Sequence, residues 1–158
     1  MKQQPRFSII LPNIRSAHNV GAMFRTADAC GVDHVYITGY TATPPHPQID
    51  KVSLGAEIWM SWSYHKDVLS LLRRLKKQGV QLLALEKTSE SQDIANMALK
   101  PPLSLVVGNE VEGLTPDILA LCDVVAHIPM YGKKESLNVS IAAGIGMYQI
   151  KKFLMSNI

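Results

Sequence analysis

The sequence predicts an α/β fold, in which a parallel sheet has helices on both faces. Strand-like and helix-like runs alternate along all 158 residues, as they do in chains that wind around a parallel sheet. The strand-like runs are short and continuously apolar, as in Leu103–Val107, which is typical of strands covered on both faces. With 47% hydrophobic residues the chain can bury a core, and its length suits a single domain over residues 1–158.

The first half of the chain contains three strand-like and three helix-like runs. Asn19 is a good helix-capping residue and is expected to begin the first helix, which Gly31 ends. Several prolines make residues 40–48 a rigid loop. The strands expected here are 7–11, 34–38 and 60–64, and the helices are 19–30, 51–56 and a leucine-rich helix from 68 that Gly79 closes.

The second half continues the alternation and ends in a long helix. Thr115 followed by Pro116 is a typical helix start. The expected strands are 81–86, 103–107 and 124–129, and the other expected helices are 93–99 and 136–154. Ligands of parallel sheets bind beyond the carboxyl ends of the strands. The loops 12–18, 108–113 and 130–135 are therefore the candidate functional sites.

Composition and motifs argue against several classes of protein. No apolar run is long enough to span a bilayer, and the N-terminus lacks the apolar stretch of a secretory signal. Cys30, Cys122 and the histidines have no metal-ligand spacing, so no metal is expected. Two free thiols favour the cytoplasm. The glycine pattern of dinucleotide-binding loops and the Lys-Ser/Thr ending of a phosphate-binding loop are both absent.

The net charge of +3 is compatible with a polyanionic partner. The basic residues are partly clustered, and the clusters are Arg73, Arg74, Lys76 and Lys77, the pair at 133–134 and the pair at 151–152. Such clusters are either solvated faces or contacts for nucleic-acid phosphates, and charge alone leaves both interpretations open.

Two polar residues stand out in the first helix. Asn19 and Arg25 are six residues apart, and we expect them on roughly similar faces. Arg25 interrupts an apolar stretch, where a guanidinium needs a partner. It either forms an ion pair with Asp28 or another carboxylate, or faces a substrate phosphate that its planar fork matches.

The loop after the strand 103–107 has glycines at 108 and 113 that flank two carboxylates. Gly108 would allow a ligand to approach the backbone closely, although the loop also fits an ordinary turn between a strand and a helix.

At the start of the last helix, Ser136, Asn138 and Ser140 either cap the helix or form a polar pocket with its free N–H groups. Gly144 and Gly146 follow within the same helix. A glycine in a helix costs about 1 kcal/mol relative to alanine, so we expect close packing there against another element.

Three segments, in order along the chain, resemble the signatures of the SpoU/TrmH family of RNA ribose 2′-O-methyltransferases, in the SPOUT superfamily. They are residues 19–27, residues 107–114, and residues 128–130 together with 136–143. Residues 54–57 also resemble a recurrent segment of the family. The resemblance extends over nearly the whole chain.

The resemblance implies an α/β fold with a C-terminal trefoil knot, which is a rare exception to unthreaded topology. It implies a homodimer with the site beside the subunit interface and S-adenosylmethionine (S-adenosyl-L-methionine) bound in the knot. Arg25 would be the catalytic residue, supported by Asn19, Ser136 and Asn138. The implied cofactor-binding residues are Leu85, Glu86, Val107, Gly108, Asn109, Glu110, Ile128, Pro129, Met130 and Leu137.

The implied reaction is methylation of a ribose 2′-hydroxyl in structured RNA, either tRNA or rRNA. Because a guanidinium stays protonated, we expect Arg25 to hold the adjacent phosphate and stabilise charge on the reacting oxygen. We expect no separate RNA-binding domain, so that RNA is recognised by the core dimer. Small and apolar faces on the first and last helices also favour a homodimer. The alternative function is a non-catalytic RNA-binding protein with the same fold.

Overall fold

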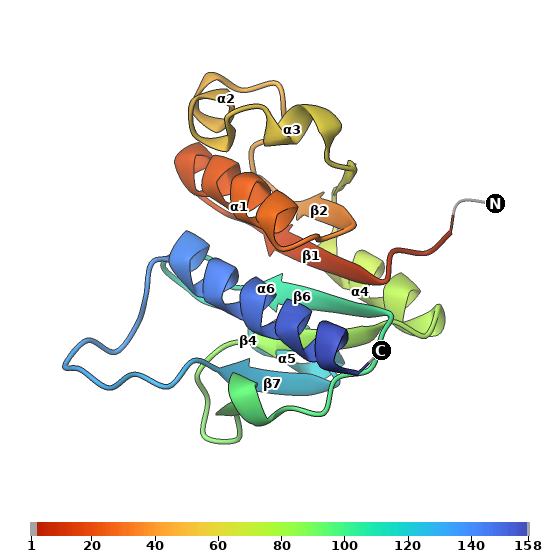
Figure 1. The fold of residues 1–158 in the computed structure, drawn as a ribbon, viewed down its shortest axis with the longest axis vertical. Coiled ribbons are helices and arrows are strands. Elements are labelled where there is room, and N and C mark those ends of the chain that lie inside the picture. The colour runs from red at the N-terminus through yellow and green to blue at the C-terminus, as the bar shows by residue number, and fades with distance from the viewer. Residues whose placement is uncertain (1–2, 158) are drawn as a thin grey trace.

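The computed structural model describes residues 3–157 and contains a seven-stranded sheet whose paired strands are all parallel (Figure 1). The strand order is β3-β2-β1-β6-β4-β7-β5. The strands are β1 (Phe7–Pro12), β2 (His34–Thr38), β3 (Trp62–His65), β4 (Gln81–Leu85), β5 (Gln92–Asp93), β6 (Leu103–Val107) and β7 (Val124–His127). Because all strands run the same way, the loops that follow them share one edge of the sheet, called here the carboxyl edge.

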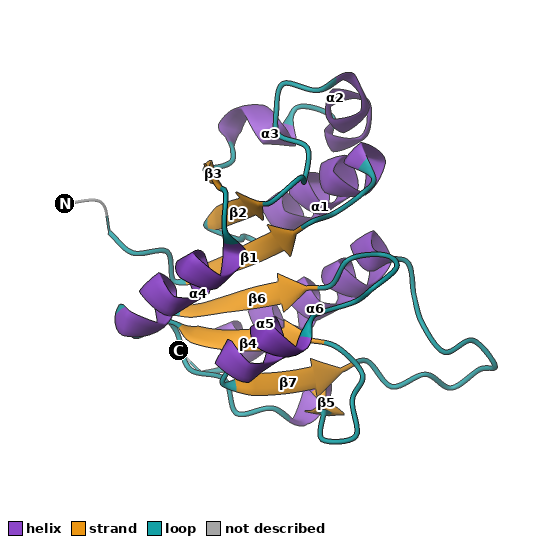
Figure 2. Cartoon of the chain, turned by 180° about the vertical axis from the view of Figure 1, so that it is seen from behind, coloured by secondary structure: helices purple, strands orange, loops and turns teal. Residues whose placement is uncertain are grey.

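Helices cover both faces of the sheet, as predicted (Figures 1 and 2). On one face α1 (Ala17–Ala29) packs against α6 (Val139–Ser156), and α2 (Pro47–Ser53) and α3 (Ala56–Trp59) extend this layer beyond α1. The opposite face carries α4 (Val68–Lys77) and α5 (Pro116–Leu121), which stand in front of the sheet in Figure 2. A short 3-10 turn, η1 (Ile94–Asn96), contacts α6.

The strands divide the hydrophobic core into two layers. On β1, Ile9 and Leu11 belong to the core cluster that includes α1 and α6, whereas Ile10 belongs to the cluster with α4 and α5. On β6, Leu105 and Val106 divide in the same way. Successive side chains of a strand point to opposite faces, so helices on both faces require continuously apolar strands. The parallel sheet predicted from those runs is confirmed.

Helix α1 begins earlier than predicted, because Ser16 and not Asn19 caps it. The Ser16 hydroxyl accepts a hydrogen bond from the Asn19 backbone N–H at 3.2 Å. Asn19 therefore lies in the first turn, where the residue is 7% exposed and its side chain bonds with residues of other segments. Serine caps helices as well as asparagine does, and the sequence alone could not rank the two positions.

Three other helix boundaries also differ from the prediction. Helix α2 begins at Pro47, inside the expected proline-rich loop, because proline suits the first helical position and His46 caps the backbone N–H of Gln48. The helix expected over 93–99 is instead the short strand β5 followed by η1. Helix α6 begins at Val139, since the Asn138 side chain accepts from the backbone N–H groups at its start.

The family-like segment 54–57 divides the single helix expected over 51–56 into α2 and α3. Leu54 and Gly55 have φ angles of 53° and 94°, which interrupt the right-handed helix. Across this break the Ser53 hydroxyl donates to the buried Glu57 carboxylate. The segment therefore forms a hydrogen-bonded corner beside α1.

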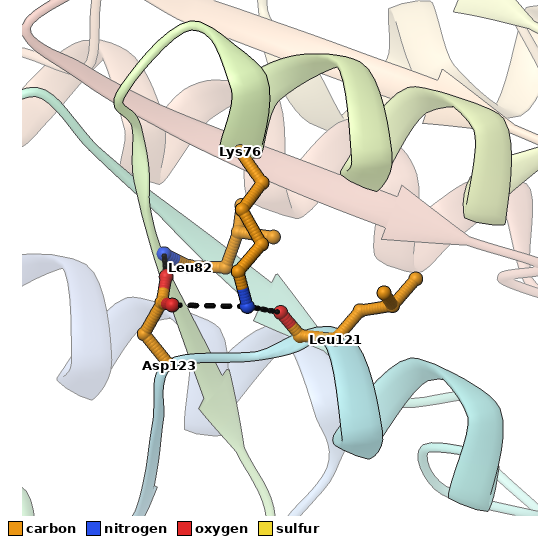
Figure 3. Close-up of polar contacts among 4 residues, drawn as sticks. All are labelled: Lys76, Leu82, Leu121 and Asp123. Atoms are coloured by element: carbon orange, nitrogen blue, oxygen red, sulfur yellow. Dashed lines mark hydrogen bonds and ion pairs between the residues drawn. The ribbon is translucent and has the colours of Figure 1, made fainter.

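On the opposite face, one member of the basic cluster joins α4 to the end of α5 (Figure 3). The Lys76 ammonium donates to the Leu121 carbonyl at 2.9 Å and lies 3.1 Å from the Asp123 carboxylate. Asp123 in turn accepts from the Leu82 backbone N–H at 2.8 Å. All four residues of the cluster are exposed, and Lys76 differs from Arg73, Arg74 and Lys77 in forming these contacts within the protein.

Within residues 3–157 no helix is long and apolar enough to cross a membrane. The same residues contain no group of three or more His, Cys, Asp or Glu side chains placed to hold a metal ion. Cys30 and Cys122 are free thiols. Burial raises the pKa of Cys30 and, together with the neighbouring Asp123 carboxylate, raises that of Cys122 to about 12.

Candidate active site

A pocket of about 410 Å³ lies at the carboxyl edge, between the loops after β4, β6 and β7 and the start of α6. All the predicted cofactor-binding residues line it except Pro129. Of the predicted catalytic residues, Ser136 and Asn138 line the pocket, whereas Asn19 and Arg25 do not. The structure therefore gathers residues from three distant segments of the chain into one cavity.

The Asn109 side chain shapes the loop after β6, residues 108–113, called here the pocket loop. All the hydrogen-bonding groups of this side chain are used within the protein. Its amide nitrogen donates to the Asn13 carbonyl at 2.6 Å and to the Tyr40 hydroxyl at 2.8 Å. Its amide oxygen accepts from the backbone N–H groups of Val111 and Glu112. The Asn109 side chain thus fixes the loop and has no hydrogen-bonding group left for a ligand.

The two glycines of this loop are required by the loop itself. A Cβ atom on Gly108 would lie 2.9 Å from the Cα of Gly113, and a Cβ on Gly113 would meet the Glu86 carboxylate. That carboxylate accepts a hydrogen bond from the Leu114 backbone N–H at 2.8 Å. Gly108 therefore allows the loop to fold back on itself, and since it also lines the pocket, the close approach of a ligand expected from the sequence stays a prediction.

A hydrogen-bonded chain joins the loop after β6 to α1 and α6. The Asn19 amide donates to the Glu110 carboxylate at 3.1 Å, and the Asn19 carbonyl oxygen accepts from the Asn138 amide at 3.2 Å. The Glu110 carboxylate also accepts from the backbone N–H groups of Arg15 and Ser16, at 2.9 and 3.0 Å. Asn19 is thus the bridge between two residues of the pocket.

This chain of hydrogen bonds favours the ionised form of Glu110. Partial burial would raise the pKa of Glu110, but the hydrogen bonds from the Arg15 and Ser16 backbones and the Asn19 amide outweigh it and lower the pKa below its usual value. The carboxylate is therefore a fixed negative charge that holds the start of α1 against the pocket loop.

Arg25 lies outside the pocket, on the solvent-facing side of α1. Its side chain is exposed and forms no ion pair or hydrogen bond with the described residues 3–157. Asp28, the expected ion-pair partner, instead accepts from the Trp59 indole at 2.9 Å. The ion-pair interpretation of Arg25 is therefore wrong.

The expectation that Asn19 and Arg25 share a face is also wrong. Asn19 is buried and Arg25 is exposed. A separation of six residues is about 600° of helical rotation, which falls about 120° short of two full turns.

The last helix has one tightly packed side and one exposed apolar side. A Cβ on Gly144 would come within 3.3 Å of Thr26 on α1, and a Cβ on Gly146 within 3.2 Å of Leu85, so the predicted close packing of these glycines is confirmed. Ile141, Ile145 and Tyr148 are 55%, 41% and 62% exposed. They form an apolar stripe, the α6 stripe, on the same layer as α1.

The pocket suits a ligand that combines an aromatic base with positive charge. Its volume lies within the range of small-molecule sites, and Leu85, Val107, Ile128 and Leu137 supply apolar walls. The charged residues of its lining are mostly acidic, with Glu86, Glu110, Glu112 and Glu135 against Lys87. A sulfonium nucleoside that carries an amino-acid tail has the apolar and cationic parts that such a lining accommodates.

Comparison with known proteins agrees with this geometry. The model of the SpoU rRNA methylase family matches residues 6–148. The chain belongs to the SpoU rRNA methylase family. The resemblance inferred from three sequence segments is confirmed.

Named relatives of this SpoU-family chain include both tRNA and rRNA enzymes. A tRNA (guanosine(18)-2′-O)-methyltransferase of Aquifex aeolicus is 33% identical over 96% of this chain and 71% of its own length. The crystal structure of the A. aeolicus TrmH/SpoU tRNA-modifying enzyme aligns with a TM-score of 0.87 and 30% identity, over 99% of this chain and 79% of its own. An AdoMet-bound rRNA methyltransferase from Sinorhizobium meliloti aligns with a TM-score of 0.89 and 27% identity, over 96% and 58%.

The sequence did not identify every residue that lines the pocket of this SpoU-family chain. The additional lining residues are Lys87, Val111, Glu112, Gly113, His127, Glu135, Val139 and Ala142. Most of them are neighbours of predicted residues. Ala142 could have been found from helical spacing, because it lies four residues after Asn138 and so on the same side of α6.

Proposed function

We propose that this chain transfers the methyl group of S-adenosylmethionine to a ribose 2′-hydroxyl of tRNA or rRNA. The observation that carries the proposal is the convergence of two of the three family-like segments, 107–114 and 128–130 with 136–143, on one pocket at the carboxyl edge, to which Asn19 of the first segment is hydrogen-bonded. The names of the relatives support both the reaction and RNA as the substrate, and the AdoMet-bound relative supports the cofactor. An enzyme that acts on these RNAs is expected in the cytoplasm.

S-adenosylmethionine, when bound, supplies an electrophilic methyl group on a sulfonium sulfur. In the reaction the ribose oxygen forms a bond to the methyl carbon, the carbon–sulfur bond breaks, and the hydroxyl proton leaves. The protein's own residues align the two reactants, and alignment alone can supply much of the rate acceleration. The apolar walls of Leu85, Val107 and Ile128 would hold the base and exclude water.

Arg25 is proposed to act on the RNA, not on the cofactor. It lies outside the pocket and its guanidinium makes no ion pair or hydrogen bond within residues 3–157. A free planar fork can bind the phosphate beside the reacting ribose and stabilise negative charge on the oxygen. Ser136 and Asn138 line the pocket, and Asn19 is not part of the pocket wall but accepts a hydrogen bond from Asn138.

A homodimer is proposed as the active form. The α6 stripe is exposed, and it lies on the same layer of the fold as α1, which carries Arg25 (Figure 1). Contiguous exposed apolar side chains mark protein interfaces, and two copies of a self-complementary patch form a symmetric dimer. Docking of a second copy would bring a partner's surface beside Arg25, which a single chain leaves apart from the pocket.

We also propose that residues 1–158 form one catalytic domain with a trefoil knot in its C-terminal part. Membership of the family supports the knot. The strand order supports it as well, because β4 lies between β6 and β7, and α6 then returns to pack on β6. This order places the last helix beside earlier strands, as a knot in this part of the chain would require.

Cofactor binding is the first test. S-adenosylhomocysteine at saturating concentration should raise the melting temperature by mass action, whereas NAD should not. Leu137 lines the pocket and is 38% exposed, so Leu137→Arg should fold and abolish the shift. A melting temperature that S-adenosylhomocysteine leaves unchanged would contradict the proposed cofactor.

Methyl transfer is the second test. The chain should incorporate labelled methyl groups from S-adenosylmethionine into RNA from cells that lack its gene. A methylated 2′-oxygen cannot attack the neighbouring phosphate, so the label should be recovered in alkali-stable dinucleotides. Label recovered on bases would contradict ribose methylation, and no label in any RNA would favour the non-catalytic alternative.

A further inference from the structure

Two exposed tyrosines lie at the carboxyl edge, outside the cofactor pocket. Tyr40 follows β2 and is 63% exposed, and Tyr64 lies in β3 and is 48% exposed. Exposure of a large aromatic ring to water is unfavourable. Aromatic side chains gathered at the same edge as the pocket therefore indicate a surface that binds another molecule.

Hydrogen bonds fix these tyrosines through their polar ends. The Tyr40 hydroxyl accepts from the Asn109 amide at 2.8 Å, and the Tyr40 backbone N–H donates to the Asn13 side chain at 3.0 Å. The Tyr64 hydroxyl donates to the carbonyl of Gly39, next to Tyr40, at 2.8 Å. Tyr40 is therefore anchored to the pocket loop and Tyr64 to the backbone beside Tyr40, while part of each ring's surface stays open.

A cationic side chain lies beside the same loop. The Arg15 backbone N–H donates to Glu110, and the Arg15 side chain is exposed without a hydrogen bond or ion pair to residues 3–157. The Glu110 carboxylate already accepts hydrogen bonds from two backbone N–H groups and from Asn19. The guanidinium of Arg15 is thus available to an external anion.

We propose that Tyr40 and Arg15, with Tyr64 beside them, bind an unpaired nucleotide of the RNA next to the methylated one. The Tyr40 ring stacks on the base and the Arg15 guanidinium binds a phosphate. Aromatic rings combined with arginine are the usual means of binding single-stranded RNA, because every base has a face to stack and every linkage has a charge. This inference rests on the proposed RNA substrate and names the surface that holds it.

The position of Tyr40 gives it a second effect on the pocket. Asn109 lines the pocket and is held in part by the Tyr40 hydroxyl. The ring and the hydroxyl of Tyr40 therefore have separable roles, since the ring faces RNA and the hydroxyl positions the loop.

Substitutions at Tyr40 separate these two roles. Tyr40→Phe keeps the ring and removes the hydrogen bond to Asn109, whereas Tyr40→Leu removes both. Binding is measured by the anisotropy of fluorescein-labelled bulk tRNA, and S-adenosylhomocysteine affinity by calorimetry. The Phe variant should bind RNA as the parent does, while the Leu variant should bind it about 10-fold more weakly, within the range of one lost stacking contact. Any change in S-adenosylhomocysteine affinity should be equal in the two variants.

Trp59 provides a matched control, because it is also 63% exposed but contacts Asp28 at the end of α1. Trp59→Leu should bind RNA like the parent. Arg15→Gln should weaken RNA binding and reduce the slope of log affinity against log salt by about 0.7, as expected for one lost phosphate contact on a single strand.

The proposal is wrong if Tyr40→Leu binds the labelled tRNA as tightly as Tyr40→Phe, or if Trp59→Leu weakens binding equally. It is also wrong if Arg15→Gln leaves the salt slope unchanged. Failure of the proposed function would be seen differently, as a parental protein that binds no S-adenosylhomocysteine or transfers no methyl group. RNA binding by the four variants still tests the surface in that case.

Discussion

The two sides of α1 differ in whether their polar side chains have hydrogen-bonding partners within the chain. On the side toward the carboxyl-edge loops, Asn19 is buried and bonded to both Glu110 and Asn138. On the other side, Arg25 is exposed without an ion pair or hydrogen bond to the described residues, on the same layer as the α6 stripe. The pocket proposed for the cofactor is thus lined by residues of one chain, and we propose that another molecule covers the face with Arg25.

The largest effect is expected from removing Arg25. Arg25→Ala should slow single-turnover methyl transfer at saturating RNA by about 10²-fold or more, the scale of a lost transition-state donor. Arg25→Lys should recover little, because a point charge cannot make a two-pronged contact. S-adenosylhomocysteine should bind both variants almost as it binds the parent, since Arg25 lies outside the pocket. A near-parental rate for the Ala variant would show that Arg25 is dispensable. The exposed side of α1 would then have no demonstrated part in methyl transfer.

The second prediction tests whether a second copy covers the α6 stripe. Ile145→Asp places a charge in the middle of the stripe, so it should dissociate the dimer at micromolar concentration and reduce methyl transfer by about 10-fold or more. Sedimentation should then give a species near 17.4 kDa, against twice that mass for the parent. Ala120→Asp adds the same charge at an exposed position of α5 on the opposite face and should stay dimeric. A parental protein that sediments as a monomer would contradict the dimer.

The third prediction concerns the side of α1 on which Asn19 is hydrogen-bonded to Glu110 and Asn138. Glu110→Gln keeps the shape of the side chain but removes the charge that three donors share. Charge-assisted hydrogen bonds are stronger than neutral ones, so the loop should loosen and S-adenosylhomocysteine should bind several-fold more weakly. Calorimetric titration of the parent and the variant measures the difference.

The same variant has a predictable pH dependence. The folded protein lowers the pKa of Glu110, so its charge adds stability above the unfolded value of about 4.3. That contribution disappears as the pH falls through the lower folded value. The parent should therefore melt at a higher temperature than the Gln variant at neutral pH. This difference should begin to shrink below about pH 4 and disappear as the pH falls further. A gap that persists in acid would show that the Glu110 charge is not its cause.

The sequence predicts most of the sheet, because continuously apolar runs such as Leu103–Val107 have few alternatives to a doubly covered strand. It predicts the pocket for a related reason. Residues such as Leu85 and Ile128 follow strands, and parallel strands bring their ends to one edge. The family resemblance then selects these residues from all those at that edge.

What the sequence does not predict depends on tertiary contacts. The cap of α1 moves from Asn19 to Ser16 because Asn19 is used by Glu110 and Asn138, which are distant along the chain. The packing role of Gly108 depends on the backbone of Gly113, which folds back onto it. Neither contact has a local signal. The exposure of Arg25 follows from helical geometry, and a helical wheel would have found it.

The smallest effect is expected far from both sides of α1, at the contact between Lys76 and Asp123 (Figure 3). Their side chains are 43% and 34% exposed, and exposed ion pairs contribute about 0–1 kcal/mol. Lys76→Ala should therefore lower the melting temperature by less than about 4 °C and leave S-adenosylhomocysteine affinity unchanged. Asp123→Ala should cost more, about 1–3 kcal/mol, because the Leu82 backbone N–H loses its acceptor. Thermal denaturation with and without S-adenosylhomocysteine measures both quantities. If Lys76→Ala weakens S-adenosylhomocysteine binding as much as Glu110→Gln does, the lower affinity of Glu110→Gln results from lower overall stability. The hydrogen bonds around Asn19 would then have no special part in forming the pocket.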